Sequence, residues 1–274
     1  MGELLQRRER GAEAVTVYRG IPETSPYHWG AGLNMAEELY RLDDAEAAIA
    51  TYEALAEDRP GEMQPLFQLG NLLRMEKRFE EAAAAYERAV ERLGEVGPGY
   101  WALLYYRGIA YERMGEWEKA EADFLRTLEL QPEQPQVMNY LAYSWVEQHV
   151  RLAEALAMLK RAVELRPTDG YIVDSLGWAL YRLEDYQGAV EQLERAVELS
   201  PAEPVINDHL GDAYWQVGRK REARVQWQRT LSLAPSDDLD PAVIRRKIEE
   251  GLATPLPEES DGDGSDGGEA PAGN

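Results

Sequence analysis

A short motif that ends in proline recurs through this chain at a nearly constant interval. The segments RTLELQP, RAVELRP, RAVELSP and RTLSLAP end, 35, 34 and 34 residues apart, at Pro132, Pro167, Pro201 and Pro235. Pro60 ends an earlier unit, and Gly94 stands 34 residues later, where a proline would fall. A fixed period of this length predicts a stack of small helical units that bury their apolar faces against each other.

Small residues also recur at fixed places within each unit. An alanine lies twelve residues before each unit ends: Ala48, Ala82, Ala120, Ala155, Ala189 and Ala223. A second small residue lies about twelve residues further upstream: Ala36, Gly70, Gly108, Ala142, Gly177 and Gly211. Ala142 is displaced by one position, which places one extra residue in the following turn, VEQHVRL. Helices approach closely where side chains are small, and the bulky residues between these positions then fill the grooves.

This pattern resembles the tetratricopeptide repeat (TPR) family, whose unit is a helix–turn–helix of 34 residues with small residues at the helix contact and proline at the end. The resemblance covers residues 29–235 and implies six full repeats. We therefore expect an all-α protein, a right-handed α-α superhelix of the TPR solenoid type. An ordinary helical bundle would not need alanine at the same register in all six units.

The N-terminal residues 1–28 continue the same register through Ala14, Tyr18, Ile21 and Pro26. They match the second helix of an incomplete repeat whose first helix is missing. The chain is then a fragment of a longer repeat protein, or residues 1–10 cap the stack, or its open face pairs with another subunit. A polar terminal cap is what solubility requires of a solenoid, which favours the fragment.

The C-terminal residues 236–252 read as a capping helix. Asp240 suits the N-cap, and Gly251 suits the stop. Ile244 and Ile248 would seal the last repeat, and we expect Lys247 and its arginine neighbours to face outward. Residues 253–274 contain six acids and no base and predict a disordered acidic tail.

Composition excludes several classes of function. The chain has 29 Lys and Arg against 51 Asp and Glu, a net charge of −22, which argues against nucleic acid and anionic lipid as partners. Cysteine is absent and the three histidines lie far apart, so we expect no metal site.

No apolar run approaches the roughly 18 residues of a membrane span, so we expect no direct membrane insertion. No catalytic or phosphate-binding motif is present, so we expect no enzyme, no catalytic residues and no cofactor.

The first helix of each repeat lines the concave groove in TPR proteins, so the resemblance implies that partner contacts lie there. At those register positions the sequence is mainly aromatic, and tyrosine and tryptophan dominate binding hot spots. The predicted partner-binding groove consists of Phe67, Asn71, Arg74, Tyr105, Tyr106, Tyr140, Tyr143, Trp178, Tyr181 and Trp215. Some TPR domains capture chaperone C-termini with a clamp of Lys, Asn and Arg side chains. The corresponding positions of this sequence hold too few basic residues to form that clamp. A groove this acidic and aromatic favours a peptide with apolar anchors and basic residues.

The segment that runs from YLAYSWVEQ through DSLGWALYRL to RAVELSP is similar to the C-terminal half of longer TPR proteins of Gram-negative bacteria. Some of those are periplasmic lipoproteins anchored to the outer membrane, and at least one type is an adaptor for a carboxyl-terminal processing protease. The resemblance implies a non-enzymatic scaffold that binds a protein or peptide partner, with a protease adaptor as its narrower form. It implies a periplasmic or outer-membrane-associated protein if the chain is truncated, and a cytoplasmic one if it is complete.

Two other functions stay open. The chain could be the TPR portion of a larger enzyme, such as a glycosyltransferase, or a homo-oligomerising module that self-associates through its uncapped N-terminal helix. Further repeats and a lipid-accepting cysteine upstream would favour the adaptor. A non-repetitive upstream domain with clustered His, Asp or Gly motifs would favour the enzyme.

Overall fold

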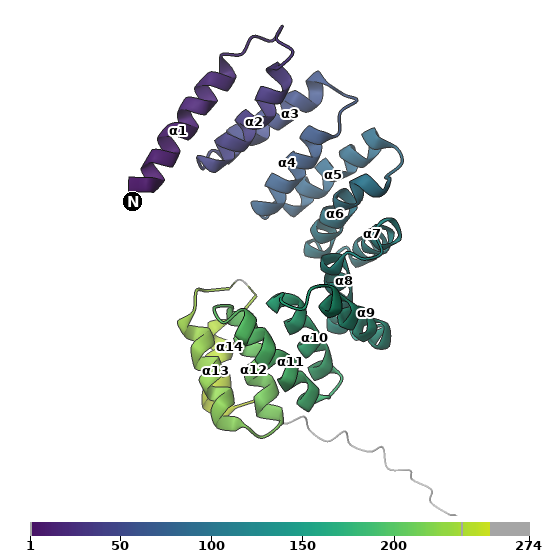
Figure 1. Cartoon of the computed structure of the whole chain (residues 1–274), viewed down its shortest axis with the longest axis vertical. Coiled ribbons are helices and arrows are strands. Elements are labelled where there is room, and N and C mark those ends of the chain that lie inside the picture. The colour runs from purple at the N-terminus through teal and green to yellow at the C-terminus, as the bar shows by residue number, and fades with distance from the viewer. Residues whose placement is uncertain (1, 237, 253–274) are drawn as a thin grey trace, which may run out of the picture. The chain divides into compact units, whose positions relative to one another are not determined.

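The structure is a computed structural model that describes residues 2–236 and 238–252, with side chains from Arg10 onward (Figure 1). Every regular element in this part of the chain is a helix, which confirms the all-α prediction. The chain divides into two compact units, Met1–Ala179 and Leu180–Asn274. The expected acidic tail, residues 253–274, lies outside the described residues.

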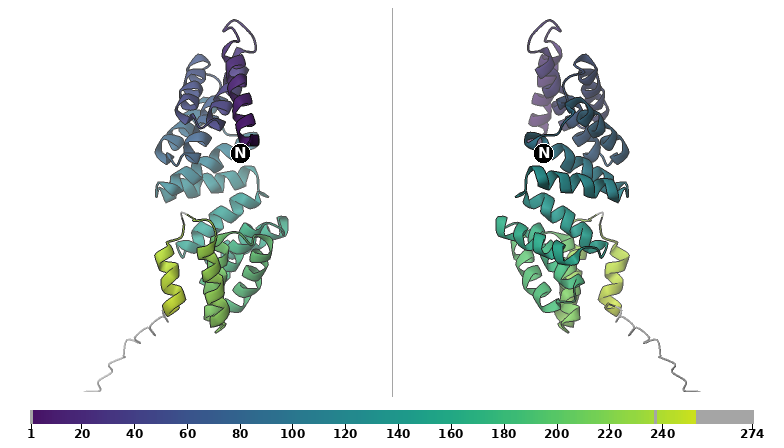
Figure 2. Two further views of the ribbon diagram at one scale, coloured as in Figure 1. Left: turned by 90° about the vertical axis from the view of Figure 1, so that its left-hand side faces the viewer. Right: turned by 90° about the vertical axis from the view of Figure 1, so that its right-hand side faces the viewer.

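Unit 1 is a series of helices that each pack on the next one along the chain, as Figures 1 and 2 show. Its helices are α1 (Gly2–Arg19), α2 (His28–Arg41), α3 (Ala45–Asp58), α4 (Gln64–Met75), α5 (Phe79–Leu93), α6 (Trp101–Arg113), α7 (Trp117–Leu130), α8 (Pro135–Glu147) and α9 (Leu152–Leu165). Helix α10 (Gly170–Arg182) crosses the boundary between the units. The even-numbered helices α2 to α8 are the first helices of the repeats, and the odd-numbered helices that follow them are the second.

The turn inside each repeat is short and contains a residue with positive φ. Asp43, Lys77 and Gly115 occupy this position in the first three repeats, with φ of 63°, 61° and 77°. A left-handed residue just past the helix end lets the chain reverse direction at once. The turn between α8 and α9 is one residue longer and contains two such residues, His149 and Arg151, which accommodates the extra residue seen in the sequence.

The small residues of the repeat lie where two helices come closest. A Cβ on Gly70 would stand 2.5 Å from the ring of Tyr86, and a Cβ on Gly108 would stand 2.7 Å from the ring of Phe124. Both rings are fully buried. The first and second helices of a repeat can therefore pack at this distance only where a side chain is missing.

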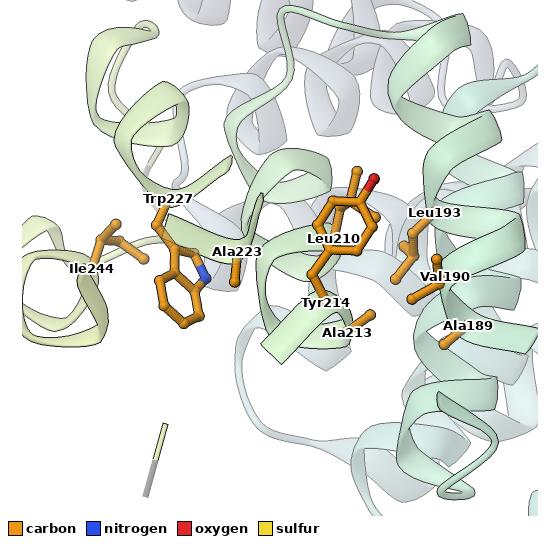
Figure 3. Close-up of a cluster of buried hydrophobic side chains, with 9 residues drawn as sticks. All are labelled: Ala189, Val190, Leu193, Leu210, Ala213, Tyr214, Ala223, Trp227 and Ile244. Atoms are coloured by element: carbon orange, nitrogen blue, oxygen red, sulfur yellow. The ribbon is translucent and has the colours of Figure 1, made fainter. Parts of the chain in front are cut away.

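Unit 2 contains α11 (Tyr186–Leu199), α12 (Pro204–Gln216), α13 (Lys220–Ser232) and α14 (Pro241–Glu250). Figure 3 shows its core, in which the ring of Trp227 on α13 lies between Ile244 on α14 and residues of α12. The same close contact recurs here, because a Cβ on Gly211 would stand 2.4 Å from Trp227 Nε1. Asp240 caps α14 through its carboxylate, which accepts from the backbone N–H of Ala242 at 2.8 Å.

The expectation that Lys247 faces outward is wrong. Its ammonium donates to the carboxylates of Asp208 and Asp212 on α12, at 2.8 Å to each, and its side chain is only 14% exposed. Trp227 Nε1 also donates to Asp212, at 2.9 Å. Two acids spaced four residues apart on α12 form a buried negative site, and the ammonium of Lys247 on α14 compensates their charge.

Burial raises the pKa of Asp212 to about 6, and the neighbouring carboxylate of Asp208 adds to the rise while Lys247 opposes it. Burial by itself would lower the pKa of Lys247, but the two carboxylates outweigh it and raise this pKa. The end of unit 2 is thus closed by an apolar contact at Ile244 and by one buried charge cluster.

We expect Gly70→Ala to destabilise the chain. Its new methyl would meet a ring that cannot move into solvent, which costs about 1–3 kcal/mol. Gly30→Ala is the matched control, because a Cβ there meets nothing within 4 Å, and in a helix this exchange adds up to about 1 kcal/mol of stability. Urea unfolding followed by circular dichroism measures both. Equal or greater stability for Gly70→Ala would contradict the close-contact account.

We also expect the stability of the chain to depend on the titration of Asp212. Its pKa lies at about 6 in the folded chain against an ordinary value of 3.8, so between these values the folded state binds one more proton than the unfolded state. The stabilising contribution of this carboxyl is therefore greatest below pH 3.8 and is lost as the pH rises through about 6.

Urea unfolding of the wild type and of Asp212→Asn across this pH range tests the effect. The free energy of unfolding of the wild type, relative to that of the variant, is expected to fall as the pH rises. A difference that stays constant with pH would show that Asp212 does not titrate in this window.

Candidate functional site

Four aromatic side chains form a continuous row across the first helices of unit 1. This aromatic ladder consists of Phe67 on α4, Tyr105 and Tyr106 on α6, and Tyr140 on α8. Ring centroids are 6.1 Å apart between Phe67 and Tyr106, 5.2 Å between Tyr105 and Tyr106, and 6.3 Å between Tyr105 and Tyr140. All four are half-buried, so each keeps part of its surface open to solvent.

The ladder packs against the buried aromatic rings that lie between the two helices of a repeat. Phe67 lies 6.1 Å from Tyr86, and Phe124 lies 6.2 Å from Tyr105 and 5.4 Å from Tyr140, centroid to centroid. Burial raises the pKa of Tyr105 to about 12, and burial with the nearby Glu112 carboxylate also raises the pKa of Tyr140. Tyr105 and Tyr140 are therefore neutral hydroxyls at physiological pH. The contacts with the buried rings restrict the rotamers of the ladder.

Two polar residues of α4 lie beside the ladder. The hydroxyl of Tyr86 donates to Asn71 Oδ1 at 2.8 Å, which fixes the orientation of that amide. The guanidinium of Arg74 lies over the ring of Tyr106 at 4.7 Å. The structure thus brings together Phe67, Asn71, Arg74, Tyr105, Tyr106 and Tyr140 of the predicted groove.

The other predicted residues lie further along the chain, and the first of them, Tyr143, follows Tyr140 by one turn of α8. Tyr143 on α8 is half-buried, and Trp178 on α10 donates from Nε1 to Glu147 at 2.6 Å. Tyr181 and Trp215 belong to unit 2. The Tyr181 hydroxyl accepts from Gln216 Nε2 at 3.3 Å, and its ring meets Tyr186 edge-on at 5.4 Å.

Trp215 is enclosed by neighbours within unit 2. Its ring centroid lies 5.5 Å from that of Trp227. The ammonium of Lys220 and the guanidinium of Arg224 lie 4.8 Å and 5.0 Å from the same centroid. A Cβ on Gly251 would stand 1.9 Å from this ring, so the end of α14 also lies against it. These contacts give Trp215 a packing role, although it stays half-buried like the residues of the ladder.

A pocket of about 990 Å³ lies between α1, α2 and α4, and the prediction missed most of it. The repeat register of the sequence already indicated this pocket. The register that gave the groove residues of later repeats gives, in the first repeat, five residues that all line this pocket: Leu33, Asn34, Glu37, Tyr40 and Arg41. Gln68, Asn71 and Met75 line it from α4, so the pocket adjoins the ladder through Asn71.

The described residues contain neither a group of metal ligands nor a membrane-spanning helix. In that part of the chain no group of three or more His, Asp or Glu side chains could hold a metal ion. None of the helices that the structure describes combines the length and the apolar character needed to cross a membrane.

Comparison with known proteins identifies the repeat. Family models of the tetratricopeptide repeat match residues 33–98 and 105–170, and a TPR repeat model matches residues 177–218. The chain is similar to the TPR repeat-containing protein PA4667 of Pseudomonas aeruginosa, with 25% identity over 183 residues. That match covers 66% of this chain but only 30% of the relative, so the chain spans less than a third of its length.

Solved structures show the same fold. A tetratricopeptide repeat protein from Parabacteroides merdae ATCC 43184 has a TM-score of 0.67 at 16% identity and covers 90% of this chain and 92% of that one. YrrB, a TPR protein with an unusual peptide-binding site, has a TM-score of 0.53 at 20% identity and covers 64% of this chain and 88% of that one.

Proposed function

The chain belongs to the tetratricopeptide repeat family, whose fold is in general a non-catalytic scaffold for protein–protein interaction, and from this premise we propose that it binds a partner polypeptide along the first helices of unit 1. The aromatic ladder is the observation that carries this proposal. Phe67, Tyr106 and Tyr140 keep part of their surface open although they stand in a packed row. Such a row offers apolar area that is already ordered before binding.

The energetics favour the ladder as the anchoring surface. Large aromatic side chains supply most of the free energy at protein interfaces. Rings that are fixed by neighbours lose little rotamer freedom when a partner arrives, so more of the contact free energy appears as affinity. The Tyr105 and Tyr106 rings, 5.2 Å apart on α6, form the centre of this surface.

The neighbouring pocket extends the same surface toward α1 and α2. Its lining mixes apolar groups such as Met75 with the amides of Asn34 and Gln68. Side-chain amides can both donate to and accept from the backbone of an extended peptide. YrrB shows that a stack of these repeats can carry a peptide-binding site.

A protease adaptor is the narrower form of this proposal. Its support is the resemblance of the segment around Asp174–Leu183 to adaptor lipoproteins, and its partner would be a carboxyl-terminal processing protease. Binding of such a purified protease to the chain, weakened by Tyr106→Ala, would support the adaptor. Binding that ignores this substitution would place the protease elsewhere.

Selection of short random peptides displayed on phage against the immobilised full chain tests the proposal. We expect enriched peptides that carry apolar residues, and we expect Tyr106→Ala to weaken their binding about tenfold or more in calorimetry, because an aromatic hot spot is removed. Tyr100→Ala is the matched control, since Tyr100 is 47% exposed, lies in the 3₁₀ turn Pro98–Tyr100 and is not one of the ladder residues.

Circular dichroism melting shows whether each variant is folded. The proposal fails if no peptide is enriched. It also fails if folded Tyr106→Ala and Tyr100→Ala bind the enriched peptides equally well.

A further inference from the structure

Helix α13 carries a positive charge in a strongly acidic chain. It contains four bases and one acid, Glu222, and that acid accepts from Arg219 Nε at the N-cap, at 2.9 Å. The second helices α3, α5, α7, α9 and α11 each contain at least as many acids as bases. Because the whole chain has a net charge of −22, α13 is a local reversal of the electrostatic field.

Part of this charge is exposed along one side of α13. Arg221, Val225 and Arg229 lie four residues apart, so they form a single stripe on the helix. All three are exposed, Val225 to 58%. Arg229 donates to the carbonyl of Pro201 at 3.1 Å, which holds it beside the loop between α11 and α12. Among the described residues, no carboxylate lies within 4.0 Å of Arg221 or Arg229.

Arg245 on α14 adds a further cation next to the same loop. It is exposed, and it lines a cavity of about 260 Å³ together with Leu231 of α13 and Pro204 at the start of α12. Cations of two helices therefore gather at this end of unit 2. The basic face of unit 2 is defined by Arg221, Val225, Arg229 and Arg245.

The acidic C-terminal residues begin close to this face. Arg224 on α13 donates from Nε to the carbonyl of Ile248 at 2.9 Å, so the last turns of α14 lie against the middle of α13. Residues 253–274 follow α14 and contain six acids and no base. Their first acid, Glu258, stands six residues beyond Leu252, and six residues reach at most about 20 Å, which matches the length of α13. The acids are therefore within reach of the basic face.

We propose that residues 253–274 bind the basic face of their own chain through their acidic side chains. The rest of the chain is acidic as a whole and repels this segment, so attraction is concentrated where cations gather on α13 and α14. The bound segment shields these cations from other acidic polypeptides. The proposal is independent of the ladder, which lies on the first helices of unit 1.

Tethering makes a weak attraction sufficient for this binding. Each exposed ion pair contributes little by itself and is screened by salt. A segment joined to its binding site by a short linker is present there at an effective concentration on the order of 1 mM, so several weak pairs together hold it in place. We therefore expect the binding to be reversible and strongly dependent on ionic strength.

Paramagnetic relaxation enhancement in the full chain tests the proposal. The sequence contains no cysteine, so Ser265→Cys provides a single attachment point for a nitroxide spin label. At low salt, we expect the label to broaden the amide NMR signals of Arg221, Val225 and Arg229. We expect this broadening to be lost at about 1 M salt, where the Debye length falls to about 3 Å.

Two comparisons isolate the contribution of the charges. The same labelled chain with its six C-terminal acids replaced by Asn or Gln reports the broadening that an uncharged tethered segment produces. Arg221→Gln combined with Arg229→Gln should reduce the broadening to that level. Arg126→Gln combined with Arg161→Gln is the matched control, because it removes the same charge from exposed positions on α7 and α9 and should leave the broadening unchanged.

Broadening of the stripe on α13 that is no stronger than with the uncharged segment would overturn the proposal. Broadening that persists when Arg221 and Arg229 are both replaced would also overturn it. The same holds for broadening that arises only between chains, in a mixture of spin-labelled chain with isotope-labelled chain that lacks the spin label. The comparison of charged and uncharged segments changes no residue of the described helices, so it decides the proposal even if the arginine variant is unstable.

Discussion

The contact between a glycine on one helix and a buried aromatic ring on the next is the interaction on which each unit depends. Gly70, Gly108 and Gly211 each leave a space that the ring of Tyr86, Phe124 or Trp227 fills. Dispersion contacts at this range are many, and a methyl group would remove them by forcing the helices apart. The repeat of this contact along the chain fixes the register of every other side chain on the first helices.

The same rings also position polar groups. Tyr86 packs under Gly70 and donates to Asn71, the next residue on α4. Trp227 packs under Gly211 and donates to Asp212, again the next residue. The aromatic residue thus closes the helix pair and orients the polar side chain that follows the glycine. In unit 1 that side chain lines the pocket between α1, α2 and α4, whereas in unit 2 it pairs with Lys247 of the chain itself.

The sequence predicted the helices and the residues of the ladder because both follow from a linear period. Glycine and alanine spacing fixes the register, and the register fixes which face Phe67, Tyr106 and Tyr140 occupy. The prediction for Lys247 was wrong, because α14 lies outside the repeat and the repeat period does not fix which way its side chains point. Trp215 was predicted from the same register, but no period reports its contact with the end of α14 at Gly251.

A crystal structure of the full chain with a peptide selected against it is the most direct test of where this protein holds its partner. The account predicts peptide density along α4, α6 and α8, with an apolar side chain on the rings of Tyr105 and Tyr106. Density on the outer faces of the second helices α5 and α7, with the ladder left bare, would contradict it.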